Sequence, residues 1–369
     1  MGVEDIIGID AYGGDEVDKR TALQRIVTAT KTVAREHPDK RFVMVGECIR
    51  VHQELGETPE NIDVIHGADQ KYGAVKRLAE MTAAGDIGGF YTLANTKIIV
   101  PLVNRHIGTF EACAYAFPNN RFLPLLAELP KSRASKGAHS CYLLDVGAVP
   151  DVTHDNYVMY AQVGRLYATA VGKRKPVTIG LLNIGSEANK GTGALQEAYD
   201  RLHAVLPDHP PARERNLDRF IGNVEPYVCM FDHDKGREEP RPVTVVVGDA
   251  FTLNIMIKSA STGADFLKEE IRYEIQHGGW CEKGGAALSK PMYRRIKERV
   301  NRYGVATFPC IKRPVYKGHG TTSIEGIVAG LEHQIEDIDA KSSDAMRVAL
   351  ESYAKEIAAR ERRPETKAF

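Results

Sequence analysis

Short runs of β-branched and other apolar residues recur along the chain, separated by longer segments with helical periodicity. The run at Thr244–Gly248 is typical, because three valines follow Thr244 before the run ends in glycine. A strand so uniformly apolar is buried on both faces, as in a parallel sheet covered by helices. The pattern therefore predicts an α/β fold, with a mostly parallel sheet and helices on both of its faces. The other predicted strands are Asp5–Asp10, Arg41–Gly46, Ile62–Ile65, Ile87–Thr92, Cys141–Val146 and Thr178–Ile184.

The clearest amphipathic segment between these strands is Thr21–His37, where Leu23, Ile26 and Val33 share one face. Similar segments are Ala74–Ala84, Ala194–Val205 and Ser323–Ile338, and Ser343–Arg360 is typical of a final surface helix. We therefore expect a single α/β/α domain over residues 1–342, with a helical excursion around 260–303. Residues 343–369 are expected to form a C-terminal helix and a charged tail.

Composition excludes several classes of function. The 49 basic side chains balance the 49 acidic ones, so the chain has no overall field that would attract nucleic acid. No apolar run approaches the roughly 18–20 residues of a membrane-spanning helix, and the start has no basic leader, which predicts a cytoplasmic protein. The six cysteines are scattered without a C-x-x-C pair, so neither zinc nor a disulfide framework is indicated. Buried structural thiols are expected, and a nucleophilic cysteine remains the alternative.

Glycine, aspartate and asparagine follow several of the predicted strands. In an open parallel sheet the carboxyl ends of the strands lie on one edge, where such folds bind ligands, so we expect these loops to form one site. Glycines allow close backbone approach, and helix N-termini favour an anion such as phosphate or a carboxylate. The alternative is that these residues only make turns and helix caps. The substrate-binding candidates are Asp10, Gly13, Gly14, Asp15, Asn95, Thr96, Asp145, Gly147 and Gly185.

The sequence contains none of the common nucleophile or nucleotide motifs, neither G-x-S-x-G, H-E-x-x-H, a complete P-loop nor G-x-G-x-x-G after a strand. A reaction whose nucleophile is inorganic phosphate needs anion-holding groups more than a catalytic serine. His319 lies between two glycines, two residues after Lys317 and just before a predicted helix. It could transfer a proton near neutral pH, or it could be a hydrogen-bonded loop histidine.

Six motifs occur in a characteristic order: "IDAYGGD", "FYTLANT", "YLLDVGAVPD", "GLLNIGSEANKG", "GDAFTLN" followed by Lys258, and "KGHGT". In this order they resemble the bacterial acyl-ACP:phosphate acyltransferase family of phospholipid synthesis, from about Gly8 to about Ile338. The resemblance implies an α/β/α sandwich similar to isocitrate dehydrogenase and phosphotransacetylase, usually a homodimer. It also implies transfer of an acyl group from acyl carrier protein, or another acyl thioester, to inorganic phosphate, with no metal or organic cofactor.

The resemblance also implies roles for individual residues. Lys190 would hold phosphate, and Asn254 would stabilise the oxyanion that develops on the thioester carbonyl. Asp249 and His319 would orient groups or transfer protons, and Lys258 would join the substrate-binding set.

Several positions depart from the family pattern. The family has glycine where Ala94, Lys97, Ala250 and Leu253 stand, and asparagine where Val149 stands. A leucine at a position that needs positive φ would cost about 1–2 kcal/mol and would fill space for a ligand. We include Lys97 among the substrate-binding candidates. Its positive charge could hold an anion at a place where a glycine would let the backbone approach it. Two hypotheses remain: an acyltransferase with an altered donor or acceptor, or a silent member that serves as partner or scaffold for a carrier protein, an acyltransferase or a ketosynthase-like enzyme.

A further departure concerns the membrane. Family members often attach to membranes through an apolar helical hairpin before the last motif. Here Gln276–Arg302 offers only Trp280 and a few small apolar residues, with basic help from Arg294, Arg295 and Lys297. So little apolar area predicts weak or no membrane association.

Overall fold

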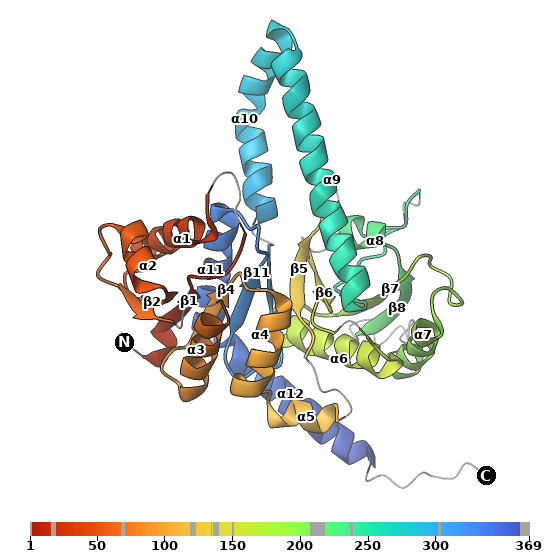
Figure 1. Ribbon diagram of the computed structural model, residues 1–369. Coiled ribbons are helices and arrows are strands. Elements are labelled where there is room, and N and C mark those ends of the chain that lie inside the picture. The colour runs from red at the N-terminus through yellow and green to blue at the C-terminus, as the bar shows by residue number, and fades with distance from the viewer. Residues whose placement is uncertain are drawn as a thin grey trace, which may run out of the picture.

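A computed structural model describes residues 2–15, 20–67, 71–118, 123–133, 135, 140–149, 151–206, 218–236, 239–301 and 304–361. In this part of the chain a sheet of eleven strands runs through the molecule, in the order β3-β2-β1-β4-β11-β10-β5-β6-β9-β7-β8. Helices cover both faces of the sheet (Figure 1). The predicted fold class, an α/β protein with a mostly parallel sheet between helices, is confirmed.

The strands are β1 (Ile6–Asp10), β2 (Arg41–Gly46), β3 (Ile62–His66), β4 (Gly89–Thr92), β5 (Leu126–Pro130), β6 (Ser140–Leu144), β7 (Thr178–Leu182), β8 (Arg219–Val224), β9 (Val245–Val247), β10 (Val305–Thr307) and β11 (Val315–Gly318). The helices are η1 (Val3–Asp5), α1 (Ala22–Glu36), α2 (Cys48–Leu55), α3 (Lys71–Ala84), α4 (Thr96–Leu102), η2 (Val103–Ile107), α5 (Glu111–Ala116), α6 (His154–Ala170), α7 (Gly193–Val205), α8 (Pro226–Phe231), α9 (Ala250–His277), α10 (Trp280–Asn301), α11 (Ile324–Asp339) and α12 (Ser342–Glu361). Every predicted strand has a counterpart, whereas β5, β8, β10 and β11 were not predicted.

The direction of the strands divides the sheet into two parallel sets. Strands β1, β2, β3, β4 and β11 run parallel to one another, and so do β6, β7, β8 and β9. Three consecutive antiparallel pairings, β11 with β10, β10 with β5 and β5 with β6, separate the sets. An odd number of reversals makes the two sets run in opposite directions along the ladder. The expectation that all polar loops share one edge is therefore wrong.

Each set buries its strands between helices. Helices α1, α2 and α11 cover one face of the first set, where Ile7 and Ile9 are fully buried. Helix α6 crosses β6 and β9 so closely that a Cβ on its Gly164 would lie 2.5 Å from Cγ1 of Val245. The first turns of α9 pack on the other face of the second set, where Leu253 joins a core with Val246. The continuously apolar strands are thus explained by burial on both faces.

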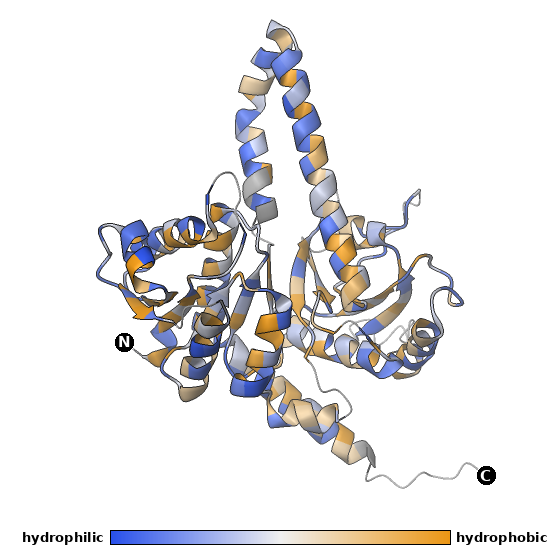
Figure 2. Cartoon of the chain, in the orientation of Figure 1, coloured by the Kyte–Doolittle hydropathy of each residue, from blue (hydrophilic) through white to orange (hydrophobic). Residues whose placement is uncertain are grey.

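Helices α9 and α10 form a long hairpin that projects away from the sheet (Figure 1). Figure 2 shows hydrophobic and hydrophilic residues interleaved along both helices. Trp280, near the tip, is 86% exposed. None of the helices in the described part of the chain is long and apolar enough to cross a membrane. The predicted charged tail, residues 362–369, lies outside the described residues.

Candidate functional site

The loop after β1 is built around Asp10, which is buried. Its carboxylate accepts hydrogen bonds from the Tyr12 N–H, at 3.0 Å, and from the Thr92 hydroxyl at the end of β4, at 2.6 Å. Gly13 lies against the same strand end, because a Cβ there would be 2.8 Å from the Ala94 nitrogen. Asp10 and Gly13 therefore shape this loop and hold it to the end of β4.

The loop after β4 leads directly into α4. The Asn95 side chain caps the helix by accepting from the Lys97 N–H at 2.9 Å, and Thr96 is the first helical residue. Lys97 is exposed. Asn95 thus serves as a helix cap, one of the two alternatives for such residues. The Lys97 ammonium is placed where charge could attract an anion from solvent.

A cluster of charged groups forms where β11 ends, and we name its members Asp15, Lys258, Lys317 and His319 the cationic cluster. Burial and, to a smaller extent, the Lys258 ammonium together lower the pKa of Lys317 to about 8. Burial also lowers the pKa of His319, as do Lys317 and Lys258, while Asp15 opposes this effect. Like charges gathered in a half-buried position repel one another and are stabilised when an anion binds between them. Lys317 was noted in the sequence only as a neighbour of His319.

The His319 ring has a defined orientation. Its Nδ1 accepts from the Thr321 N–H at 3.3 Å and lies 2.8 Å from the Thr321 hydroxyl oxygen. A backbone N–H can only donate, so the proton of the neutral ring is on Nε2. His319 can therefore present an Nε2–H donor while its other nitrogen is held by the loop.

The loop after β6 is organised by the buried carboxylate of Asp145. It accepts from the backbone N–H groups of Leu125, Gly147, Ala148 and Val149, at distances between 2.7 and 3.1 Å. Burial raises the pKa of Asp145 to about 6, although these hydrogen bonds favour the ionised form. With its oxygens occupied by backbone donors, Asp145 serves to shape the loop. Val149, where the family has asparagine, donates its backbone N–H to this carboxylate, and its side chain is buried.

Helix α9 connects this loop to the cationic cluster. Asp249 caps the helix by accepting from the Thr252 N–H, at 2.8 Å. Gly147 has a φ of 147°, and a Cβ there would lie 3.7 Å from Nδ2 of Asn254. Asn254 and Lys258 are four residues apart on α9, so they share one face with a rise of about 6 Å between them. Asn254 therefore lies between the loop after β6 and the cluster at the end of β11.

Leu253 does not have the role expected from the departures in the sequence. It lies in the second turn of α9, and the non-glycine residues with positive φ in the described chain are Lys173, Asp232 and Lys341. Its side chain is fully buried in the core, and a Cβ on Gly248 would be 2.9 Å from Cγ of Leu253. The expectation of backbone strain and of a side chain in ligand space is wrong, because the position is an ordinary helical one that faces the sheet.

We predict that Leu253→Gly lowers the free energy of unfolding by about 3–6 kcal/mol, because it combines a large core cavity with a glycine in a helix. Urea unfolding followed by circular dichroism measures the change. Ile255→Gly is the matched control, because Ile255 is 47% exposed on the same helix and should lose about 1 kcal/mol. Equal losses in the two variants would contradict the assignment of Leu253 to the core.

The loop after β7 carries Gly185 and Lys190. Two asparagines hold it: Nδ2 of Asn183 donates to the Lys190 carbonyl at 3.1 Å, and Nδ2 of Asn223 donates to the Glu187 carbonyl at 2.7 Å. The Lys190 side chain passes over Gly185, where a Cβ would be 3.4 Å from its Cγ. Lys190 itself is exposed. Within the described residues, no hydrogen bond or ion pair joins it to the rest of the candidate site.

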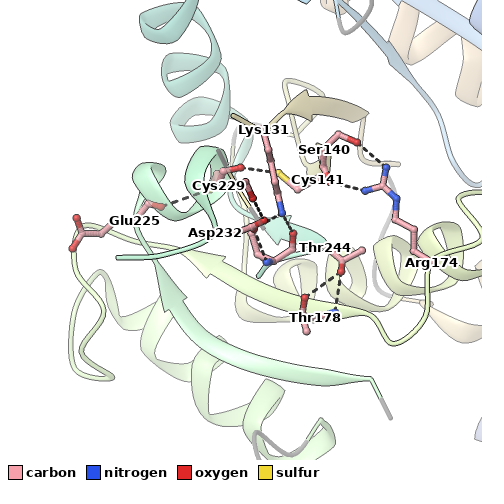
Figure 3. A network of polar contacts seen from close by, with 11 residues as sticks. Lys131, Ser140, Cys141, Arg174, Thr178, Glu225, Cys229, Asp232 and Thr244 are labelled. Atoms are coloured by element: carbon pink, nitrogen blue, oxygen red, sulfur yellow. Dashed lines mark hydrogen bonds and ion pairs between the residues drawn. The ribbon is translucent and has the colours of Figure 1, made fainter. Parts of the chain in front are cut away.

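A buried polar network lies at the other end of the second strand set, near the starts of β6, β7 and β9 (Figure 3). Lys131 pairs with Asp232 and donates to the Val243 carbonyl, and Thr178 bonds Thr244 at 3.1 Å. Burial raises the pKa of Cys141, in the same network, to about 12. A thiol with so high a pKa is not a nucleophile.

All six cysteines are free thiols, and Cys113, Cys229 and Cys310 are buried as Cys141 is. Among the described residues, no group of three or more histidine, cysteine, aspartate and glutamate side chains is placed to hold a metal ion.

Comparison with known proteins agrees with this architecture. Residues 125–344 match the family described as fatty acid synthesis protein. A phosphate acyltransferase of Thermosipho africanus is 33% identical, over 93% of this chain and 98% of its own length. One of Levilactobacillus brevis is 29% identical, over 96% of this chain and 97% of its own. A branched-chain phosphotransacylase from Enterococcus faecalis has a similar fold, with a TM-score of 0.56 at 13% identity, covering 90% of this chain and 99% of that one.

Proposed function

The chain belongs to the fatty acid synthesis protein family, and from this premise we propose that it transfers an acyl group between a carrier-protein thioester and inorganic phosphate. The relatives at 29% and 33% identity are phosphate acyltransferases, and they align with nearly the whole chain.

The observation that carries the proposal is the cationic cluster. Lys258 and Lys317 come from α9 and β11, yet each lies close enough to the other that Lys258 lowers the pKa of Lys317. Two neighbouring ammonium groups repel each other in the free site. Binding of a dianion between them offsets this repulsion. His319 adds an Nε2–H donor at the same place. Inorganic phosphate is a dianion of the size and charge that such a site favours.

The proposed reaction uses phosphate as the nucleophile. A phosphate oxygen attacks the thioester carbonyl carbon, the C–S bond breaks, and the products are an acyl phosphate and the free thiol of the carrier. The Asn254 amide donates a hydrogen bond to the carbonyl oxygen as negative charge develops on it. The Lys317 ammonium, with a pKa of about 8, supplies the proton that the departing thiolate takes up. Lys190 helps to collect phosphate from its exposed loop.

The activity is tested by mixing the protein with an acyl-carrier thioester and phosphate and trapping acyl phosphate as a hydroxamate with hydroxylamine. We expect phosphate-dependent trapping, and a loss of about 100-fold or more in Asn254→Ala, which removes one oxyanion donor. Lys190→Ala is expected to raise the KM for phosphate. Lys268→Ala is the control, because its side chain forms only exposed ion pairs on the hairpin.

Absence of any trapped product from wild-type protein would contradict the proposal. A stable complex with a carrier protein under those conditions would instead support the second hypothesis, a silent family member that acts as a partner. A homodimer and weak or no membrane association stay predictions from the sequence.

A further inference from the structure

Arg25, on the second turn of α1, is the largest fully buried side chain near the candidate site. Its guanidinium donates to three backbone carbonyls, those of Asp15, Gly320 and Thr322, with the Nη2 to Gly320 distance at 3.0 Å. None of its hydrogen-bond acceptors in the described chain is a side-chain carboxylate. Nothing in the sequence singled out this residue, because it lies on a helix in an otherwise ordinary amphipathic segment.

The three carbonyls belong to two loops that lie near opposite ends of the sequence. Asp15 follows β1, and Gly320 and Thr322 follow β11. The loops also meet directly, since the Asp15 N–H donates to the Gly320 carbonyl at 2.9 Å. They fit closely, because a Cβ on Gly320 would lie 2.5 Å from Oδ2 of Asp15 and one on Gly14 would lie 3.0 Å from the Gly320 oxygen. Gly14 has a φ of 104°, which glycine adopts without strain.

These two loops carry half of the cationic cluster. Asp15 and His319 both lie within them, and Lys317 precedes His319 by two residues. Thr321, which orients the His319 ring, stands between the two carbonyls that Arg25 holds on that loop. The guanidinium therefore links the two backbone segments that carry Asp15 and His319.

Arginine suits this task for a physical reason. Its planar fork carries five donors, so one side chain can meet three carbonyls from two directions, which an ammonium on a flexible stem does less well. Burial lowers the pKa of Arg25, but a guanidinium keeps its charge in proteins. The Asp15 carboxylate acts in the opposite direction and favours the charged guanidinium.

We propose that Arg25 is a positioning residue of the anion site, which fastens the loop after β1 to the loop after β11 and so holds His319 and Asp15 in their binding arrangement. The inference deepens the proposed function and rests on it for the role of phosphate as a substrate. The arrangement of the two loops, and the environment of His319, follow from Arg25 whether or not acyl transfer occurs.

The test compares wild-type protein with Arg25→Met and Arg25→Lys. The pH titration of the His319 ring is followed by NMR and assigned with His319→Gln, and binding of inorganic phosphate is measured by calorimetry. In wild-type protein His319 should titrate below its ordinary pKa, because burial and two lysines disfavour its charge. In Arg25→Met the loops separate and water enters, so the titration should move up toward the ordinary value and phosphate affinity should fall at least about tenfold. Arg25→Lys should fall between the two.

Arg174→Met is the matched control, because Arg174 also donates to a backbone carbonyl, that of Ser140 at 2.7 Å, but at the far end of the second strand set (Figure 3). It should lower stability and leave the His319 titration and phosphate binding unchanged. If Arg25→Met and Arg25→Lys behave like this control, Arg25 is only structural and the proposal is overturned. If the titration responds to Arg25 while wild-type protein shows no acyl transfer, the positioning role stands and the proposed function fails.

Discussion

Lys317→Met is expected to lower kcat/KM for phosphate by about 100-fold or more, because it removes an ammonium that helps to hold phosphate and supplies the proton for the departing thiolate. The same variant should be more stable than wild-type protein when no phosphate is present. The lowered pKa of Lys317 means that its charged form is disfavoured in the empty fold, and methionine carries no charge. Hydroxamate trapping measures the first effect and thermal unfolding without phosphate measures the second.

The pH dependence provides an independent check on Lys317. Its pKa in the fold is about 8, against an ordinary 10.5, so kcat/KM should fall as the pH rises through about 8 and the ammonium is lost. Lys258→Met removes the neighbouring charge and should move this alkaline limb to higher pH. A limb that stays in place in both variants would exclude Lys317 as its source. A less stable Lys317→Met protein would show that the ammonium is already satisfied in the empty site.

Asp145→Ala is expected to lower the free energy of unfolding by about 3–4 kcal/mol at pH 7, because it leaves buried N–H donors without an acceptor. Leu125, Gly147, Ala148 and Val149 supply those donors. Activity should fall as well, since Gly147 lies against Asn254 and the loop loses the carboxylate that accepts its backbone N–H groups. Asp145→Asn keeps one acceptor oxygen and should lose less stability than alanine. Urea unfolding of the three proteins makes the comparison.

The pKa of Asp145 fixes how this effect changes with pH. The folded pKa of about 6 lies above the ordinary 3.8, so between these values the folded protein binds more protons than the unfolded chain. The contribution of Asp145 to stability is therefore greatest at low pH and declines as the pH rises from about 4 to about 6. The stability difference between wild-type protein and Asp145→Ala should narrow over that window. A difference that widens would show that the pKa is lowered instead.

Local sequence pattern predicted much of the architecture. The strands at Arg41–Gly46 and Thr244–Gly248 were found because uniformly apolar runs have to be buried on both faces, and this held for both. The strand β5 was missed because it contains Glu128 and ends in Pro130, and β10 and β11 because they are short and partly polar. The direction of the sheet reverses at these strands. Because they were missed, the polar loops were wrongly expected to share one edge of the sheet.

For the candidate site, the sequence indicated which residues carry chemistry but not which of them meet. Polar and glycine-rich strand ends marked Asp10 and Asp145, and two flanking glycines before a predicted helix marked His319, because turns, caps and anion sites all need these residue types. The tertiary structure decided that Asp145 organises a loop and that Leu253 belongs to the core.

The sequence by itself determined where the chain is apolar, where it turns and what class of fold those periods allow, since these depend on neighbours within a few residues. Only the tertiary structure decided that Lys258 meets Lys317 and that Arg25 joins two loops from opposite ends of the chain. Such meetings depend on strand direction and on helix packing, which are set by contacts over hundreds of residues. The periodicity of the local sequence therefore does not predict these contacts.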